Sequence, residues 1–484
     1  MEYFIEGSKN KWEVILGLEV HAQISSKSKL FSEAPTNWGG EPNSQVELVD
    51  CGMPGALPVI NEYCIEQAIL TGLSLNAEIN KMSIFDRKNY FYPDLPKGYQ
   101  ITQMTKPIIE KGSIKIFADD SEKVINITRA HLEEDAGKSI HDLFEGETGV
   151  DLNRAGTPLL EIVSEPEISN AKEAVAYFKA VRQLVTFLDI CDGNMAQGSM
   201  RCDVNVSIKK SGDKELGTRA ELKNINSFKF IEKAINYEID RQIRVIESGD
   251  SVVQETRLYD SEKNETRSMR SKEEANDYRY FPCPDLLPVV ISDKELQEIK
   301  ESLPELPEEK EHRYISDVGL DESEAKIISS SKTMANMFEE ASTKTNDAKL
   351  VAKWLVGDVS ALLNKDNIDI EESNLSPENF GKLIERISDS TISGKIAKSV
   401  LEEVWESGSD VDEIVETKGL VQIQDESILV EIAKKVVESN PDQVTAYKGG
   451  KDKLFGFFVG QVMKETQGKA NPKSVNEILK KILN

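Results

Sequence analysis

The chain has 484 residues, of which 39% are hydrophobic and 30% charged, and its formal net charge is −26 at pH 7. This length exceeds what one hydrophobic core usually organises, so we expect two to four domains of ordinary globular composition. The composition excludes a membrane span, because no apolar run approaches roughly 18 residues, and the acidic charge argues against general nucleic-acid affinity.

The first 290 residues have the pattern of a mixed α/β domain. Apolar and β-branched residues in alternation predict strands, and apolar residues at 3.6-residue spacing behind a polar cap predict helices. We expect strands at 12–21, 113–118, 123–132, 158–164 and 200–208, and helices at 62–75, 171–188 and 228–246. The segment Asp86–Gln100 combines four aromatic residues with two prolines and predicts an ordered loop.

After about residue 293 nearly every segment has helical periodicity. A Pro-rich break at Leu303–Pro307 separates two helices, and a Ser/Gly/Asp-rich link at Glu406–Asp410 indicates a second boundary. The fold class is therefore α+β. We predict an α+β domain over residues 1–294, an all-α helical domain over 295–408 and a small α-helical tail domain over 409–484.

The tail is basic although the chain is acidic. Residues 448–484 contain eight lysines and three acidic residues, so this segment carries +5 and the remainder −31. Such a segment can bind a polyanion locally. Alternatively, the lysines only keep two helices soluble, and the composition does not decide between these readings.

The cysteines and the N-terminus indicate a reducing compartment. The five cysteines form no CxxC pair, and their odd number and wide spacing argue against disulfides and a zinc ribbon. We expect reduced, mostly buried thiols. The N-terminus has neither the basic flank nor the apolar stretch of a signal peptide, so the protein is expected to be cytoplasmic, without a membrane partner.

Three consecutive acids, Glu133, Glu134 and Asp135, follow the β-rich run Val124–Thr128. At the end of a strand, such hard oxygen ligands could gather around a divalent cation. The alternative is a solvated turn.

Two further positions offer ligands of the same kind. Glu19 and His21 are two apart on a predicted strand, so their side chains share one face, as metal ligands or as a base with its orienting partner. Glu161 ends an apolar strand, where burial requires a metal or a salt bridge to Arg154 or Arg129. A mostly oxygen site with one nitrogen favours Mg²⁺ or Mn²⁺ over zinc and is typical of phosphoryl transfer.

The common nucleotide-binding motifs are missing. Gly137–Ser139 resembles the end of a P-loop, but Leu132 stands where that loop has its first glycine. There is also no GxGxxG after a strand and no GxSxG elbow, and four histidines give a serine–histidine triad little support. If ATP binds, it binds by neither of the two common loops.

Seven segments resemble, in order, the B subunits of the bacterial aspartyl/glutamyl-tRNA amidotransferases. They are Gly17–His21, Asp86–Pro93, His131–Lys138, Asn153–Pro166, Gly198–Asn205, Glu221–Ser227 and Asp277–Pro282, and Gly468–Pro472 fits the tail domain of that family. The likeness runs from about residue 12 to the C-terminus.

The resemblance implies a fold and a reaction. The first domain would be a cradle with a twisted antiparallel sheet, like that of glutamine synthetase and guanidino kinases. ATP would phosphorylate the side-chain carboxylate of Glu-tRNA(Gln) or Asp-tRNA(Asn), and ammonia would then displace phosphate to give the amide. The amidase of the complex would supply the ammonia, and a small third protein would tether the amidase to this chain in a heterotrimer.

The family's functional positions can be carried over motif by motif. Its metal positions correspond to His21, Glu134 and Glu161. The other implied catalytic residues are Glu19, Glu133, Asp135 as a reserve, and, near the ammonia entry or the phosphates, Lys88 and Lys97; the tail residues proposed for tRNA are Lys464, Lys469 and Lys473. Strand alternation places Glu134 opposite Glu133 and Asp135, so the sequence leaves open which acid touches the metal.

The chain departs from many family members in one loop. They carry a zinc-binding cysteine cluster where this chain has Phe31–Asn61, and only Cys51 remains here, so we expect ATP and Mg²⁺ (or Mn²⁺) but no zinc.

Two rival readings use the same acids. A stand-alone metal-dependent phosphohydrolase leaves the helical and tail domains unexplained, and a non-catalytic tRNA-binding scaffold makes the acids salt-bridge partners.

Overall fold

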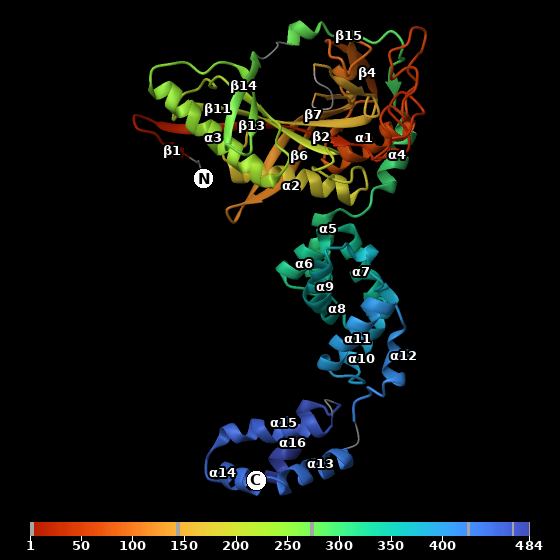
Figure 1. Cartoon of the computed structure of the whole chain (residues 1–484), viewed down its shortest axis with the longest axis vertical. Coiled ribbons are helices and arrows are strands. Elements are labelled where there is room, and N and C mark those ends of the chain that lie inside the picture. Colours follow the sequence, from red (N-terminus) through yellow and green to blue (C-terminus); the bar gives the residue numbers. More distant parts are fainter. Residues whose placement is uncertain (1–3, 142–145, 272–274, 424–425, 467–468, 484) are drawn as a thin grey trace. The chain divides into compact units, whose positions relative to one another are not determined.

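The computed structural model describes residues 4–141, 146–271, 275–423, 426–466 and 469–483, so Gly468 of the tail motif lies outside the described residues. The chain divides into two compact units, Met1–Leu306 and Pro307–Asn484, which we describe separately (Figure 1). Within the described residues, no helix has the length and apolar character of a membrane span.

Unit 1 is built on a ten-stranded sheet with the order β14-β13-β12-β11-β2-β10-β7-β6-β3, and β1 pairs with β2. The pairing is antiparallel except between β12 and β13, which a helix connects. The strands are β1 (Phe4–Glu6), β2 (Lys11–Gln23), β3 (Glu78–Ile79), β6 (Ile109–Ala118), β7 (Ser121–Glu134), β10 (Pro158–Ser164), β11 (Met200–Lys210), β12 (Ala220–Lys223), β13 (Glu255–Asp260) and β14 (Glu265–Ser271). The five predicted strands are thus confirmed.

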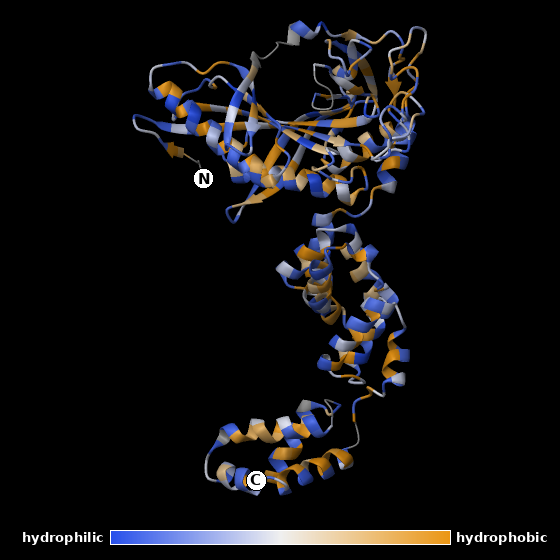
Figure 2. Ribbon diagram, in the orientation of Figure 1, coloured by the Kyte–Doolittle hydropathy of each residue, from blue (hydrophilic) through white to orange (hydrophobic). Residues whose placement is uncertain are grey.

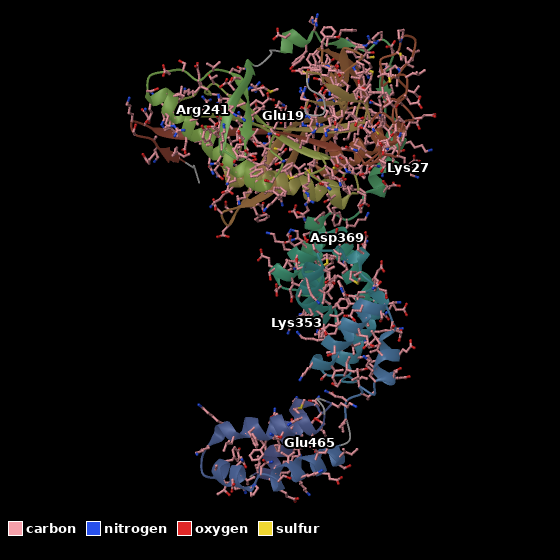
Figure 3. The ribbon with its side chains drawn as sticks, viewed as in Figure 1. Glu19, Lys27, Arg241, Lys353, Asp369 and Glu465 are labelled. Atoms are coloured by element: carbon pink, nitrogen blue, oxygen red, sulfur yellow. The ribbon has the colours of Figure 1, made fainter. Side chains whose placement is uncertain are left out.

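The central strand β2 separates a core face from a polar face. Its even-numbered residues, from Trp12 to Ala22, are buried in the hydrophobic core, and its odd-numbered residues from Glu13 to Gln23 are half-buried on the opposite side. This follows from the two-residue period of a strand. Glu19, labelled in Figure 3, belongs to the polar face.

Helices close the core of unit 1. The predicted helices are confirmed as α1 (Glu62–Ser74), α2 (Ala171–Phe187) and α3 (Phe228–Glu247), and they contact the strands β6, β7 and β11 of the sheet. Asn61 and Asn170 cap the first two by accepting hydrogen bonds from backbone N–H groups. Along α3, Figure 2 shows hydrophobic and hydrophilic residues interleaved, as expected of a helix with one buried face.

A small sheet lies beside β7. It consists of β4 (Met82–Asn89), β5 (Tyr99–Lys106), β15 (Phe281–Pro282) and β16 (Val289–Val290), and β5 contacts β7. The predicted loop over Asp86–Gln100 was too long, because strand pairing extends to Asn89 and resumes at Tyr99. The two prolines lie inside the remaining turn, where they cost no ladder hydrogen bond. Strands β8 (Lys138–Ile140) and β9 (Gly149–Asp151) form a separate hairpin.

The regular elements described in unit 2 are all helices, and they form two separate cores. One core spans residues from Tyr314 to Val415, and the other spans residues from Leu429 to Leu483. The α-helices from the end of unit 1 onward are α4 (Asp293–Ser302), α5 (Pro307–Arg313), α6 (Glu322–Ser329), α7 (Lys332–Ser342), α8 (Ala348–Trp354), α9 (Ser360–Asp366), α10 (Pro377–Ser388), α11 (Gly394–Ser407), α12 (Val411–Thr417), α13 (Glu426–Glu438), α14 (Pro441–Lys448), α15 (Phe455–Glu465) and α16 (Pro472–Leu483). The predicted domain boundaries at 294 and 408 stay predictions.

Candidate active site

Polar residues form a row across four strands of the large sheet. Glu161 on β10 pairs with His131 on β7 on one side and with His21 on β2 on the other. His21 in turn pairs with Arg201 on β11. Directly paired residues of neighbouring strands point to the same face, so these four side chains share the polar face of the sheet.

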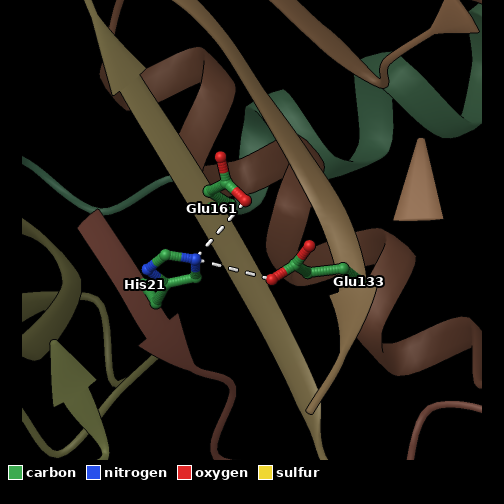
Figure 4. A group of neighbouring side chains, drawn as sticks. All are labelled: His21, Glu133 and Glu161. Atoms are coloured by element: carbon green, nitrogen blue, oxygen red, sulfur yellow. Dashed lines mark ion pairs between the residues drawn. The ribbon is translucent and has the colours of Figure 1, made fainter. Parts of the chain in front are cut away.

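Two of these side chains, His21 and Glu161, converge with Glu133 into what we call group I (Figure 4). His21 Nε2 lies 3.4 Å from Glu161 Oε2 and 3.5 Å from Glu133 Oε1. One ligand atom from each residue lies within 4.8 Å of the others. Two carboxylates and one imidazole at this spacing can hold a divalent cation, and oxygen-rich ligands favour Mg²⁺ or Mn²⁺.

Burial and mutual charge set the protonation of group I. Burial alone would lower the pKa of His21, but the carboxylates of Glu161 and Glu133 raise it to about 9. Burial together with the charge of Glu161 raises the pKa of Glu133 to about 7. Behind them, burial lowers the pKa of His131 to about 4, so this imidazole is neutral at pH 7.

Glu133 occupies the position in group I that the family resemblance predicted for Glu134. Because neighbouring residues of β7 face opposite ways, Glu134 points away and accepts hydrogen bonds from Lys97 Nζ at 2.5 Å and from the backbone N–H of Ile101 at 2.8 Å. Both members of that ion pair are buried. The assignment of Glu134 as a metal ligand is therefore not supported by the geometry, and Lys97 is tied to Glu134 instead of lining the cavity.

Asp135 holds two arginines together. Its carboxylate accepts hydrogen bonds from Arg154 at 2.5 Å and Arg201 at 3.1 Å. Burial alone would raise the pKa of Asp135, but the two guanidinium groups lower it. Asp135 is thus a structural bridge at the edge of the polar face. Arg154 therefore pairs with Asp135, whereas the ion pairs of Glu161 are with His21 and His131.

A second set of acids, group II, consists of Glu19, Asp203 and Glu221. Asp203 of β11 pairs directly with Glu19 of β2. Lys223 forms salt bridges with both Asp203 and Glu221. Burial and the neighbouring carboxylates raise the pKa of Glu19, whose Oε1 accepts a hydrogen bond from Asn205 at 2.8 Å.

Both groups line one cavity of about 430 Å³. Lys88 of β4 enters it from the small sheet, and its ammonium lies 4.8 Å from the ring centre of Tyr278. Burial lowers the pKa of Lys88, but the carboxylates, Glu133 first, raise it more. Arg129 and Arg219 add positive charge, and the buried Nε of Arg129 has no hydrogen-bond partner among the described residues.

Sequence reasoning found part of this cavity. It singled out Glu19, His21, Lys88, Glu133 and Glu161, all of which line the cavity. It did not single out Asp203, Arg219, Glu221 or Lys223 as site residues, and it named Arg129 only as a possible salt-bridge partner of Glu161. The alternation of β11 was a usable signal for Asp203, whereas the pairing of β11 with β2 was not visible in the sequence.

Neither the cysteines nor the tail lysines are members of groups I and II. All five cysteines are free thiols; Cys51 is half-buried and the other four are buried, as expected. Lys464 on α15 and Lys473 on α16 are exposed, and Lys469 between them is half-buried. The proposed role of these lysines stays a prediction.

Two family models match the chain. The "GatB/GatE catalytic domain" matches residues 14–297, which include every residue of groups I and II, and the "GatB domain" matches residues 336–483. The chain belongs to the GatB family. The B subunit of the aspartyl/glutamyl-tRNA(Asn/Gln) amidotransferase from Hydrogenovibrio crunogenus is 58% identical over 470 residues, covering 97% of this chain and 99% of the relative. GatB proteins of the same name from Thioalkalivibrio sulfidiphilus and Pseudomonas aeruginosa are both 56% identical, and each match covers 98% of this chain and 99% or more of the relative.

Proposed function

We propose that this chain is the B subunit of a tRNA-dependent amidotransferase and carries its phosphorylation and amidation site. The reaction converts Glu-tRNA(Gln), Asp-tRNA(Asn) or both into the amides, as a ligase that forms a carbon–nitrogen bond with glutamine as amido donor. The observation that carries the proposal is group I, which lies in a polar cavity inside the segment that matches the catalytic domain.

The chemistry explains why the cavity combines acids with bases. A carboxylate repels nucleophiles and lacks a leaving group, so a carboxylate oxygen first attacks the γ-phosphorus of ATP and ADP leaves. The nitrogen lone pair of ammonia then attacks the acyl carbon, phosphate leaves, and the nitrogen loses a proton. The first step brings two anions together and the second releases an anionic phosphate, so cationic groups must offset this negative charge.

Group I has the donor chemistry of a Mg²⁺ or Mn²⁺ site, with two carboxylate oxygens and one imidazole nitrogen inside 4.8 Å. A divalent ion held by His21, Glu133 and Glu161 would neutralise charge between the substrate carboxylate and the phosphates. Lys88, Arg129 and Arg219 line the same cavity and would contact phosphate oxygens. The unpartnered Nε of Arg129 supports this, because a buried guanidinium nitrogen needs an acceptor.

Glu19 is the candidate acceptor for the proton that ammonia releases. Its pKa is raised by burial and by the acids around it, and a raised pKa makes a carboxylate a better base. Asn205 donates a hydrogen bond to it and fixes its orientation. Glu134 and Lys97 would support the cavity wall from behind, and Asp135 would position Arg201.

We extend the proposal to fold and partners. The sheet with its polar face would form a cradle like that of glutamine synthetase and guanidino kinases, with the helical and tail domains following at about 294 and 408. The amidase of the complex would deliver ammonia, and the small third protein would complete a heterotrimer. The basic tail, including Lys464, Lys469 and Lys473, would contact the tRNA backbone.

An exposed apolar groove on unit 1 supports association with another chain. It has a volume of about 700 Å³ between α1 and the segment 286–302, and Leu287 and Val290 are 87% and 70% exposed beside it. Glu62, Glu66 and Glu295 are among its lining residues. An apolar centre with an acidic rim fits a partner segment that carries apolar residues flanked by Lys or Arg.

The decisive experiment is amide formation on Glu-tRNA and on Asp-tRNA, assayed separately with all three proteins of the heterotrimer present. We expect ATP-dependent amide formation with at least one of them. A heterotrimer that hydrolyses glutamine but neither consumes ATP nor forms the amide would overturn the proposal and favour a tRNA-binding scaffold.

A further inference from the structure

A second cavity adjoins the catalytic cavity along the same face of the sheet. It has a volume of about 720 Å³ and shares Asp203 with the catalytic cavity. Gln23, two residues beyond His21 on β2, lines it, and so does Arg201, which pairs with His21 across β2 and β11. A molecule that fills this cavity therefore lies next to group I.

The lining is rich in amide side chains. Gln23, Gln45 and Gln197 are half-buried in the wall, and none of their side chains hydrogen-bonds to a residue that the structure describes. An amide offers a donor and an acceptor together, which is what the edge of a base or a ribose hydroxyl requires. Half-buried amides without partners are ready to bind such groups.

Trp38 supplies an aromatic face to the same cavity. Its side chain is 66% exposed, and it is followed by Gly39 and Gly40, which also line the cavity. An indole left this exposed gains little from the core of unit 1. Bases stack on aromatic side chains of this kind.

The charges of this cavity nearly cancel. Arg154 and Arg201 are both held by Asp135, and Lys138 is accompanied by Asp151 and Asp192. A site for phosphate groups would need a clear excess of positive charge. The lining instead suits an uncharged, flat and hydrogen-bonding group, which is a nucleoside.

We propose that this second cavity binds an adenosine, namely the 3′-terminal nucleoside of the aminoacyl-tRNA. The inference rests on the proposed function, because in that substrate the amino acid is esterified to the terminal ribose. The nucleoside must then lie within a few bond lengths of the side-chain carboxylate that reaches group I. Asn and Gln side chains pair with the edge of adenine, and Trp38 stacks on its ring.

The test uses the complete heterotrimer and short RNAs that cannot react. The emission of Trp38 is followed while ACCA, the same RNA without its terminal adenosine (ACC), or ATP is added. We expect ACCA to quench the emission and to bind about tenfold more tightly than ACC, with Trp38→Ala abolishing that difference. Phe117→Ala, which removes an exposed aromatic ring of β6 outside the cavity, is the matched control and should leave ACCA binding unchanged.

Kinetics separate the two sources of adenosine. If the tRNA terminus binds here, Trp38→Ala raises the KM for aminoacyl-tRNA about tenfold and leaves the KM for ATP unchanged. If the KM for ATP rises instead and ATP quenches Trp38, the cavity binds the adenosine of ATP. Equal binding of ACCA and ACC, with no quenching by ATP and unchanged KM values in the variant, overturns the proposal.

The binding arm needs no turnover, so it separates this inference from the proposed function. A heterotrimer that discriminates ACCA from ACC through Trp38 but never forms the amide would support the nucleoside site and contradict the proposed function. If the parent and the Trp38→Ala and Gln23→Ala variants all form the amide normally, the proposed function is supported and the nucleoside site is contradicted.

Discussion

Groups I and II lie on the same polar face, yet their negative charge is balanced in different ways. In group II the ammonium of Lys223 lies between Asp203 and Glu221 and pairs with both. In group I the near partners of the carboxylates are the imidazoles of His21 and His131, and the latter is neutral at pH 7. Group II therefore carries a lysine ammonium as its cation, whereas the positive charge within group I sits on the His21 imidazole, whose pKa the carboxylates raise to about 9.

This difference in charge balance indicates which acids are available to bind a metal. A lysine that pairs with two carboxylates removes most of the gain that a divalent ion would bring, because the ion would have to displace it. Imidazole has no such effect, since it can itself become a ligand once it loses its proton. We therefore propose group I, and not group II, as the metal site, and the following predictions test this proposal.

The largest effect should come from group I itself. Glu133→Gln and Glu161→Gln each remove one oxygen ligand, so the rate of ATP-dependent phosphorylation of Glu-tRNA should fall at least about 100-fold. Single-turnover assays at increasing Mg²⁺ measure the loss. The control is Glu122→Gln, an exposed residue of β7. Full activity in either group I variant would show that the metal is held elsewhere.

Glu134→Gln should damage stability and leave the ligand set of group I intact. The change leaves the buried ammonium of Lys97 without its carboxylate, which should lower the free energy of unfolding by about 3 kcal/mol. Denaturant titration measures it. The double variant with Lys97→Met should recover part of the loss. A variant as stable as the parent but unable to bind Mg²⁺ would return Glu134 to the metal site.

Lys223→Met should turn group II into a site that needs a cation. Three acids without their ammonium repel one another, so we expect about 2 kcal/mol lower stability in chelator, largely restored by millimolar Mg²⁺ or Ca²⁺. Melting curves with and without cation measure this. Lys209→Met, which removes the partner of Glu13 outside the cavity, should not respond to cations. An equal response of both variants would contradict the comparison.

The three tail lysines should matter least, and only for tRNA binding. Replacing Lys464, Lys469 and Lys473 together by alanine should weaken tRNA binding by about tenfold and reduce the salt dependence, because each phosphate contact contributes a slope of about 0.7–0.9. Binding at several salt concentrations measures both. Lys395→Ala on α11 is the control outside the tail. Unchanged affinity of the triple variant would exclude these lysines from the tRNA contact.

Local pattern predicted much of the fold and part of the site. The alternation of β2 and the caps Asn61 and Asn170 depend on neighbours in the chain, so their strands and helices could be predicted. The choice between Glu133 and Glu134 as the residue that lines the cavity could not be predicted. Alternation places the two residues on opposite faces of β7 but does not say which face lines the cavity. That depends on the partners that β5 and β10 bring to β7.

Sequence alone was enough to predict the family, the strands that carry the polar residues and the residue types able to bind a metal. The tertiary structure was needed to show that Glu133 joins His21 and Glu161, that Lys223 pairs with two acids of group II, and that Trp38 lines a cavity beside them. The two kinds of information depend on different separations along the chain. Side-chain direction follows from the backbone within two residues, whereas charge balance depends on strands that pair across more than a hundred residues. The packing of distant strands gives Glu133, Glu134 and Asp135 different partners, although the three acids are adjacent in the sequence.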